Sequence, residues 1–204
     1  MPLIAASSFA PGRDLTDALG HLGHALARAG LVHGQSGNVS VRSGEALLVT
    51  AAGARLAELS IDDIVRVPHI DNPPARVTSE FALHAAIYAR RRDVHAIAHT
   101  HSPYATAWSC IAEGLELSLE EARYYGMGRL VKVARHAPAG THELAELAAA
   151  GLGERSAVLL ERHGAVVVGA NVDEARCVAE SLEHQAQVAW LLSAPAGGIR
   201  SQDD

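Results

Sequence analysis

The chain has 204 residues, of which 49% are hydrophobic and 20% charged, and this composition is typical of a single packed domain. A net charge of −6 argues against a nucleic-acid-binding surface, and the basic run at 90–92 is too short to form one. Cys110 and Cys177 cannot form a disulfide framework, no apolar stretch approaches the ~18 residues of a membrane span, and no basic segment precedes residues 1–9 as it would in a signal peptide. We therefore expect one cytoplasmic domain over residues 1–204.

The first half of the chain contains two predicted helices. Leucines recur every three or four residues over 14–29, which predicts an amphipathic helix that Gly30 ends. A glycine-rich loop is expected over 31–41. The second helix should open at Thr78-Ser79-Glu80, where hydroxyls and an acid suit a helix N-terminus, and run to about Arg91. Short strands are predicted between these helices, at 46–50 and 64–67.

The second half alternates strands and helices. A buried strand is predicted over 94–100, and Ser102-Pro103 then suits the start of a helix. Two apolar strands at 157–160 and 165–168 are separated by a sharp turn. The remaining predicted segments are a strand at 130–134, helices at 141–150 and 173–192, and a flexible tail at 193–204. This alternation indicates a single α/β domain.

Three of the 12 histidines lie at predicted strand ends. His99 and His101 are two residues apart on a strand, so both side chains project from the same face. An isolated pair of this kind is more often a partly buried, hydrogen-bonded pair than a metal site. His163, however, lies in the turn between two apolar strands and precedes Gly164. Three such histidines are consistent with a catalytic zinc site that keeps an open position.

Glu80 is the candidate fourth ligand or acid/base for this site. Taken alone, it is better explained as a carboxylate that stabilises a helix N-terminus. The other histidines offer no comparable spacing. His84, inside the predicted second helix, is expected to have a structural or surface role.

Three turns could together bind an anion. Ser36-Gly37-Asn38, the segment 50–53 and Thr78-Ser79 offer backbone N–H groups, an amide and hydroxyls, which can bind phosphate without lysine. The alternative is three unrelated turns.

The order of five segments is more specific than any one of them. In sequence letters they are GNVSVR at 37–42, LVTAAG at 48–53, TSE at 78–80, HTH at 99–101 and RHG at 162–164. With these segments in this order, the chain resembles the zinc-dependent class II aldolase family of L-fuculose-1-phosphate aldolase and L-ribulose-5-phosphate 4-epimerase. The resemblance extends from the first helix to about Leu192.

The resemblance implies one Zn²⁺ per subunit, with Glu80 approaching the metal and serving as acid/base. The histidines that it assigns to the zinc are His99, His101 and His163. The residues that it assigns to the substrate phosphate are Gly37, Asn38, Gly53, Thr78 and Ser79. It further implies a central, mostly antiparallel sheet of nine strands flanked by helices, and a homotetramer with active sites between subunits.

The expected reaction is cleavage of a ketose 1-phosphate similar to L-fuculose 1-phosphate into dihydroxyacetone phosphate and an aldehyde, through a zinc-stabilised enediolate. Ala52 replaces a threonine that contacts phosphate in the aldolase. The aldolase also has a tyrosine about twenty residues after its histidine pair. Here this region offers Glu121 and Tyr125 as candidates for the second acid.

The same metal chemistry also serves epimerases, dehydratases and decarboxylases of sugar phosphates. A zinc hydrolase that uses metal-bound hydroxide would share the ligand set. A non-catalytic module like the adducin head domain would be expected to lose the metal histidines, and all three are present.

Overall fold

The computed structural model describes residues 15–193, so almost all of the tail predicted at 193–204 lies outside the described residues. The centre is a mixed sheet of eight strands in the order β3-β2-β1-β4-β8-β7-β6-β5. All neighbouring strands are antiparallel except β6 and β7, which are parallel. The strands are β1 (Asn38–Ser43), β2 (Ala46–Thr50), β3 (Ile64–Val67), β4 (Ala96–Thr100), β5 (Gly114–Glu116), β6 (Leu130–Ala134), β7 (Ala157–Leu160) and β8 (Gly164–Gly169).

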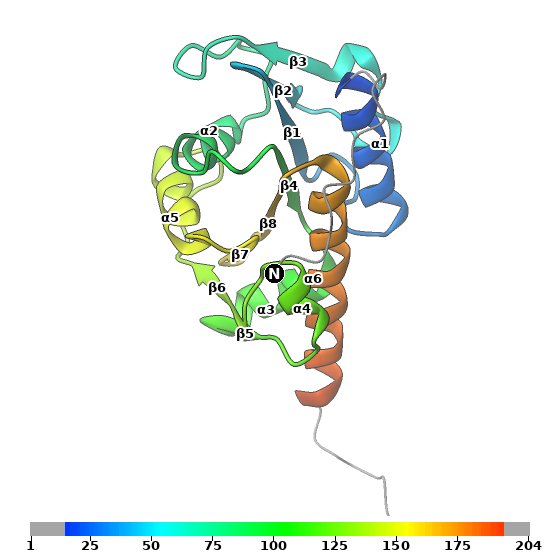
Figure 1. Ribbon diagram of the computed structural model, residues 1–204, viewed down its shortest axis with the longest axis vertical. Coiled ribbons are helices and arrows are strands. Elements are labelled where there is room, and N and C mark those ends of the chain that lie inside the picture. Colours follow the sequence, from blue (N-terminus) through cyan, green and yellow to red (C-terminus); the bar gives the residue numbers. More distant parts are fainter. Residues whose placement is uncertain (1–14, 194–204) are drawn as a thin grey trace, which may run out of the picture.

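Helices cover both faces of the sheet (Figure 1). On one face lie α1 (Leu15–Arg28), α3 (Pro103–Ile111), α4 (Glu121–Tyr124) and α6 (Val172–Ser193). On the other face α2 (Phe81–Arg90) packs against α5 (His142–Leu152). Two single 3₁₀ turns, η1 (Leu56–Glu58) and η2 (Ile61–Asp63), connect β2 to β3. Among residues 15–193, no helix combines the length and apolar character needed to cross a bilayer.

The central strands are buried on both faces. In β4, Ala98 belongs to the core under α1, α3 and α6, whereas its neighbour Ile97 belongs to the core under α2 and α5. In β8, Val167 and Val166 are divided in the same way. This alternation is the two-residue period of a strand between two apolar layers.

The predicted α/β class is confirmed, and so are the helices and strands that were predicted, to within three residues at most of their ends. The loop expected over 31–41 is wrong at its C-terminal end, because β1 begins at Asn38. Polar residues obscured this strand: Ser40 and Arg42 alternate with valines, although Ser40 is fully buried. The described residues form eight strands rather than the nine that the resemblance implies. Strand β5 and helix α4 were not predicted.

Chain segments that are far apart in sequence meet at one edge of the central sheet, the side at which β4 ends and β1 and β8 begin. β4 lies between β1 and β8, with Asn38 opposite His99 on one side and Val166 opposite His99 on the other. The end of β4 therefore lies beside the start of β1 and the start of β8. Residue Thr78, just before α2, is tied to the same region because its N–H donates to the carbonyl of Thr50 at the end of β2 (3.0 Å).

Candidate metal centre

Four side chains converge at this edge, and their candidate ligand atoms all lie within 4.8 Å of one another. We call this group the histidine–glutamate cluster; its members are Glu80, His99, His101 and His163. The three imidazole centroids are 4.6, 4.8 and 5.0 Å apart. Glu80 Oε2 lies 3.1 Å from His99 Nε2, and Glu80 Oε1 lies 3.5 Å from His163 Nε2. The structure thus brings together the four residues predicted to form the metal site.

The β7–β8 turn directs His163 into the cluster through a constrained backbone. Arg162 has a φ of +57°, a conformation that non-glycine residues adopt rarely and at a cost. A Cβ on Gly164 would lie 2.2 Å from the carbonyl oxygen of Thr100, which no side chain could tolerate. Only glycine therefore lets β8 begin this close to the end of β4.

Glu80 occupies the residue before α2, yet its side chain makes no capping hydrogen bond to the helix. The carboxylate is buried instead, and Asn38 Nδ2 donates to Oε2 at 3.0 Å. Among the described residues, Glu80 Oε1 has no hydrogen-bond partner. A buried carboxylate oxygen with no donor is unfavourable unless it meets a cation.

The hydrogen bonds of His99 fix which of its ring nitrogens faces the cluster. Its Nδ1 lies 2.9 Å from the carbonyl oxygen of Ala165 and must donate to it. In the neutral ring the lone pair is then on Nε2, which lies 2.9 Å from His101 Nε2 and faces Glu80. An imidazole lone pair and a carboxylate that face one another in this way fit a divalent metal between them, and a carbonyl that orients the far ring nitrogen is typical of metal-binding histidines.

The electrostatics of the cluster favour the protonation states that metals bind. Burial raises the pKa of Glu80, but the neighbouring imidazoles of His99 and His163 and the amide of Asn38 outweigh it and lower the value to about 2. Burial and the neighbouring imidazoles lower the pKa of His101 to about 4. Burial, then His99, also lowers the pKa of His163. Near neutral pH the cluster thus offers an ionised carboxylate and uncharged ligands at positions 101 and 163.

The three turns predicted to bind phosphate lie next to one another. Gly53 has a φ of +75° and its α-carbon faces the side chain of Gln35, which belongs to the loop before Gly37. Thr78 is buried, and Ser79 is exposed. Gly37 has a φ of +78°, and a Cβ there would lie 2.7 Å from the carbonyl oxygen of His99. The turns therefore border the histidine–glutamate cluster, and their role towards phosphate stays a prediction.

The two candidates for the second acid contact helix α6 instead of the cluster. Glu121 Oε1 accepts from Ser181 Oγ at 3.3 Å. The pKa of Tyr125 is raised by burial and by its neighbours Cys177 and Glu121. Within residues 15–193, no hydrogen bond or ion pair joins Glu121 or Tyr125 to the cluster.

His84 is a buried neighbour of the site that the sequence interpretation did not single out. It is fully buried, and its Nε2 donates to the Oδ1 atom of Asn38, the residue that donates to Glu80. A signal was available: His84 follows Glu80 by four residues, so the two side chains lie on the same side of a helix.

Known proteins that are similar to this chain support the same interpretation of the site. Residues 17–190 match the family model described as "Class II Aldolase and Adducin N-terminal domain". A 5-methylthioribulose-1-phosphate/5-deoxyribulose-1-phosphate aldolase from Rhodospirillum rubrum is 34% identical over 166 residues, covering 79% of this chain and 73% of its own. An L-fuculose phosphate aldolase from Methanococcus maripaludis is 34% identical over 171 residues, covering 83% of this chain and 93% of its own.

A solved structure supports the fold. The L-fuculose-1-phosphate aldolase of Thermus thermophilus superimposes with a TM-score of 0.80 at 30% identity, covering 89% of this chain and 98% of the other. The chain belongs to the class II aldolase and adducin N-terminal domain family, as an enzyme with a three-histidine, one-glutamate metal site.

Proposed function

We propose that this protein is a zinc-dependent aldolase that cleaves a ketose 1-phosphate to dihydroxyacetone phosphate and an aldehyde. The observation that supports it most directly is the convergence on three histidines of Glu80, whose buried Oε1 has no hydrogen-bond partner among the described residues. The similarity to aldolases of fuculose phosphate and of 5-deoxyribulose and 5-methylthioribulose phosphates favours this reaction class. Both groups of substrate share the phosphorylated ketose end and differ in the aldehyde released.

Zinc held by His99, His101 and His163 would act as a Lewis acid towards the substrate carbonyl and its neighbouring hydroxyl. In the cleavage direction the bond between carbons 3 and 4 breaks, and its electron pair stays with carbon 3. Glu80 lies beside the metal ligands and would return a proton to that carbon. The carbon 4 hydroxyl gives up its proton as it becomes the aldehyde, and we propose Glu121 or Tyr125 as the group that takes it.

The phosphate would bind where the three turns meet. The backbone around Gly37 and Gly53 and the hydroxyls of Thr78 and Ser79 would provide neutral donors. One N–H of the Asn38 amide donates to Glu80 and its oxygen accepts from His84, so any contact it makes with phosphate would come from its second amide N–H or from its main chain. Ala52 removes one hydroxyl from this group.

The assembly that we propose is the homotetramer implied by the resemblance. Large apolar side chains remain exposed near the ends of α3 and α6, at Ile111, Leu191 and Leu192. Light scattering of the purified protein tests this part, and a monomer would contradict it.

The main test is the release of dihydroxyacetone phosphate by zinc-loaded protein from L-fuculose 1-phosphate and from 5-deoxyribulose 1-phosphate. We expect cleavage of at least one of them, and Glu80→Gln should lower turnover about 10²- to 10⁴-fold while zinc stays bound. Glu58→Gln, an exposed substitution, is the matched control. A zinc-loaded protein that converts neither substrate, or whose Glu80→Gln variant retains full turnover, would contradict the proposal.

A further inference from the structure

A row of buried polar side chains leads away from Glu80 along the contact between α2 and β1. On α2 and the residue before it, the buried polar positions are Glu80, His84 and Tyr88, each four residues from the next. On β1 they are Asn38 and Ser40, and the partly buried Arg42 continues the same two-residue spacing. Four helical residues rise about 6 Å and two strand residues about 6.6 Å, so the two rows can stay in step.

Hydrogen bonds join the two rows into one chain. Asn38 Nδ2 lies 3.0 Å from Glu80 Oε2, and the other end of the same amide accepts from His84 Nε2. His84 Nδ1 lies 2.7 Å from Ser40 Oγ, which lies 3.0 Å from the Tyr88 hydroxyl. His84 and Ser40 are fully buried, and Tyr88 is 1% exposed, so water cannot substitute for these partners.

The direction of every bond in this chain follows from the carboxylate. An ionised Glu80 can only accept, so Asn38 turns its NH₂ group towards Glu80 and its oxygen towards His84. His84 must therefore carry its proton on Nε2, which leaves Nδ1 to accept from Ser40. Ser40 has then used its proton and must accept from Tyr88.

The charge states of the inner groups agree with this direction. Burial, together with the nearby His99, lowers the pKa of His84 to about 3, so the ring is neutral. Burial raises the pKa of Tyr88, although Ser40 and Arg42 oppose it, so the hydroxyl keeps the proton that it donates.

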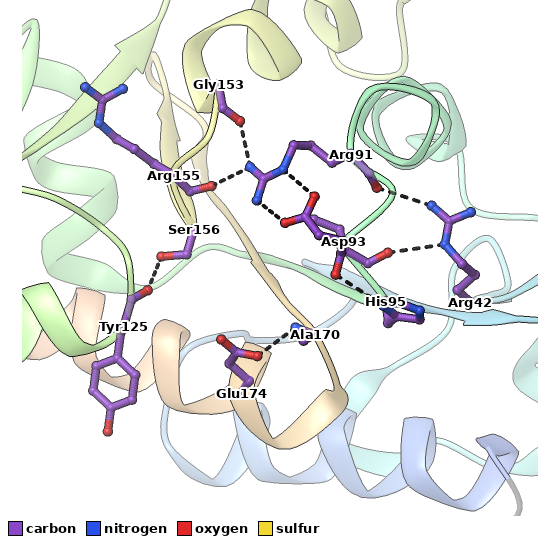
Figure 2. Close-up of polar contacts among 11 residues, drawn as sticks. Arg42, Arg91, Asp93, His95, Tyr125, Gly153, Arg155, Ser156, Ala170 and Glu174 are labelled. Carbon is purple, nitrogen blue, oxygen red and sulfur yellow. Dashed lines mark hydrogen bonds and ion pairs between the residues drawn. The ribbon is translucent and has the colours of Figure 1, made fainter. Parts of the chain in front are cut away.

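The Tyr88 end of this hydrogen-bond chain is fixed by two arginine side chains, at the ends of the strands opposite the metal site. The Arg42 guanidinium lies 4.6 Å from the centre of the Tyr88 ring and donates to the carbonyls of Tyr88 and Val94. Arg91 accepts from Arg42 through its own carbonyl, and its guanidinium binds Asp93 and the carbonyls of Gly153 and Arg155 (Figure 2). Tyr88 is thus held in place by both its ring and its backbone.

We infer that His84 is a positioning residue, which fixes the Asn38 amide so that its NH₂ group holds one oxygen of Glu80 and leaves the other facing the metal site. Without a donor at position 84, the amide could turn its oxygen towards Glu80 and repel the carboxylate. Ser40 and Tyr88 act further out, by holding His84 in the tautomer that donates from Nε2. The inference rests on the proposed function only for its expected effect on kcat.

The first test reads the tautomer of His84 directly and needs no activity. Long-range ¹H–¹⁵N spectra of the zinc-loaded protein, with histidine labelled, should contain one signal set that His84→Gln removes. We expect this set to report a neutral ring protonated on Nε2 at pH 7, and Ser40→Ala to shift its tautomer equilibrium. A ring protonated on Nδ1 in the wild-type protein would overturn the inference.

The second test compares three variants. His84→Leu removes the donor and should lower zinc affinity about 10-fold and kcat about 10- to 100-fold, with KM within twofold. His84→Gln can still donate to Asn38 and should recover most of both losses. Leu83→Ala is the control for destabilisation, because Leu83 is a buried neighbour of His84 that takes no part in the hydrogen-bond chain. This variant should have a lower melting temperature with unchanged zinc affinity and kcat.

These outcomes separate the inference from the proposed function. If the wild-type protein cleaves no ketose 1-phosphate, the proposed function fails, and the tautomer and the zinc affinities still decide the role of His84. If cleavage occurs but His84→Leu and His84→Gln lose zinc affinity equally, the positioning role is wrong.

Discussion

Asn38 and His99 lie directly opposite each other on β1 and β4. Their side chains point to the face of the sheet that α2 covers, because β1 and β4 share one alternation of side chains. The strand pairing therefore places the amide that binds Glu80 beside the first metal-ligand candidate. A register shift of one residue between β1 and β4 would turn one of the two side chains to the other face, so the strand pairing itself fixes the site.

Removing one imidazole should abolish tight metal binding. We expect His163→Ala to weaken zinc affinity more than about 100-fold, because replacing a residue that only hydrogen-bonds to a metal ligand already lowers metal affinity about 10- to 100-fold. Competition with a chromogenic chelator measures the affinity. His136→Ala, which replaces an exposed histidine in the loop between β6 and α5, is the control and should bind zinc like the wild type. Unchanged zinc affinity in His163→Ala would exclude this residue as a ligand.

The approach of β8 to β4 gives a second prediction. In Gly164→Ala the new methyl group would meet the backbone oxygen of Thr100, and we expect a loss of at least about 2 kcal/mol in the free energy of unfolding. Gly20→Ala is the matched control: nothing lies within 4 Å of its Cβ position in α1. That substitution should stabilise the protein by about 0.5 to 1 kcal/mol. Urea unfolding of both variants checks the contrast, and equal effects would contradict it.

The fold could be predicted from the sequence wherever apolar spacing was regular. The leucines of α1 and the apolar runs of β7 and β8 predicted those elements correctly. β1 was missed because Asn38, Ser40 and Arg42 make it look like a polar loop. Their burial is explained only by the polar side chains of α2 that face them. This partner lies more than 40 residues away in sequence, so the residues around β1 do not reveal it.

The histidine–glutamate cluster was predictable for a different reason. His99 and His101 share a strand face by simple alternation, the turn between two apolar strands singled out His163, and the family resemblance then assigned these three residues to the metal and Glu80 to acid/base chemistry. His84 was not predicted, because a histidine inside a helix has many possible roles and only its contact with Asn38 distinguishes them. Glu121 and Tyr125 were chosen by their distance along the chain from the histidine pair, and that distance says little about position in space.

The second acid can be identified by a pair of substitutions. We expect either Glu121→Gln or Tyr125→Phe to lower kcat for cleavage about 10²- to 10⁴-fold, because only one group takes the proton of the carbon 4 hydroxyl. Zinc content and melting temperature should change little in the variant that loses activity. If both variants retain wild-type turnover, the second acid is neither residue.

The pH dependence of stability should report the burial of His84. Its pKa is about 3 in the folded protein and 6.5 in an unfolded chain, so between these values the unfolded state holds a proton that the folded state lacks. Stability therefore falls as the pH drops from 6.5 towards 3, on the order of 1 kcal/mol per pH unit from this group. His84→Gln has no such proton, so its stability deficit relative to the wild type at pH 8 should shrink as the pH is lowered to 4. Urea unfolding of both proteins in chelator at several pH values measures the gap, and a gap that stays constant would mean that His84 takes up its proton without unfolding.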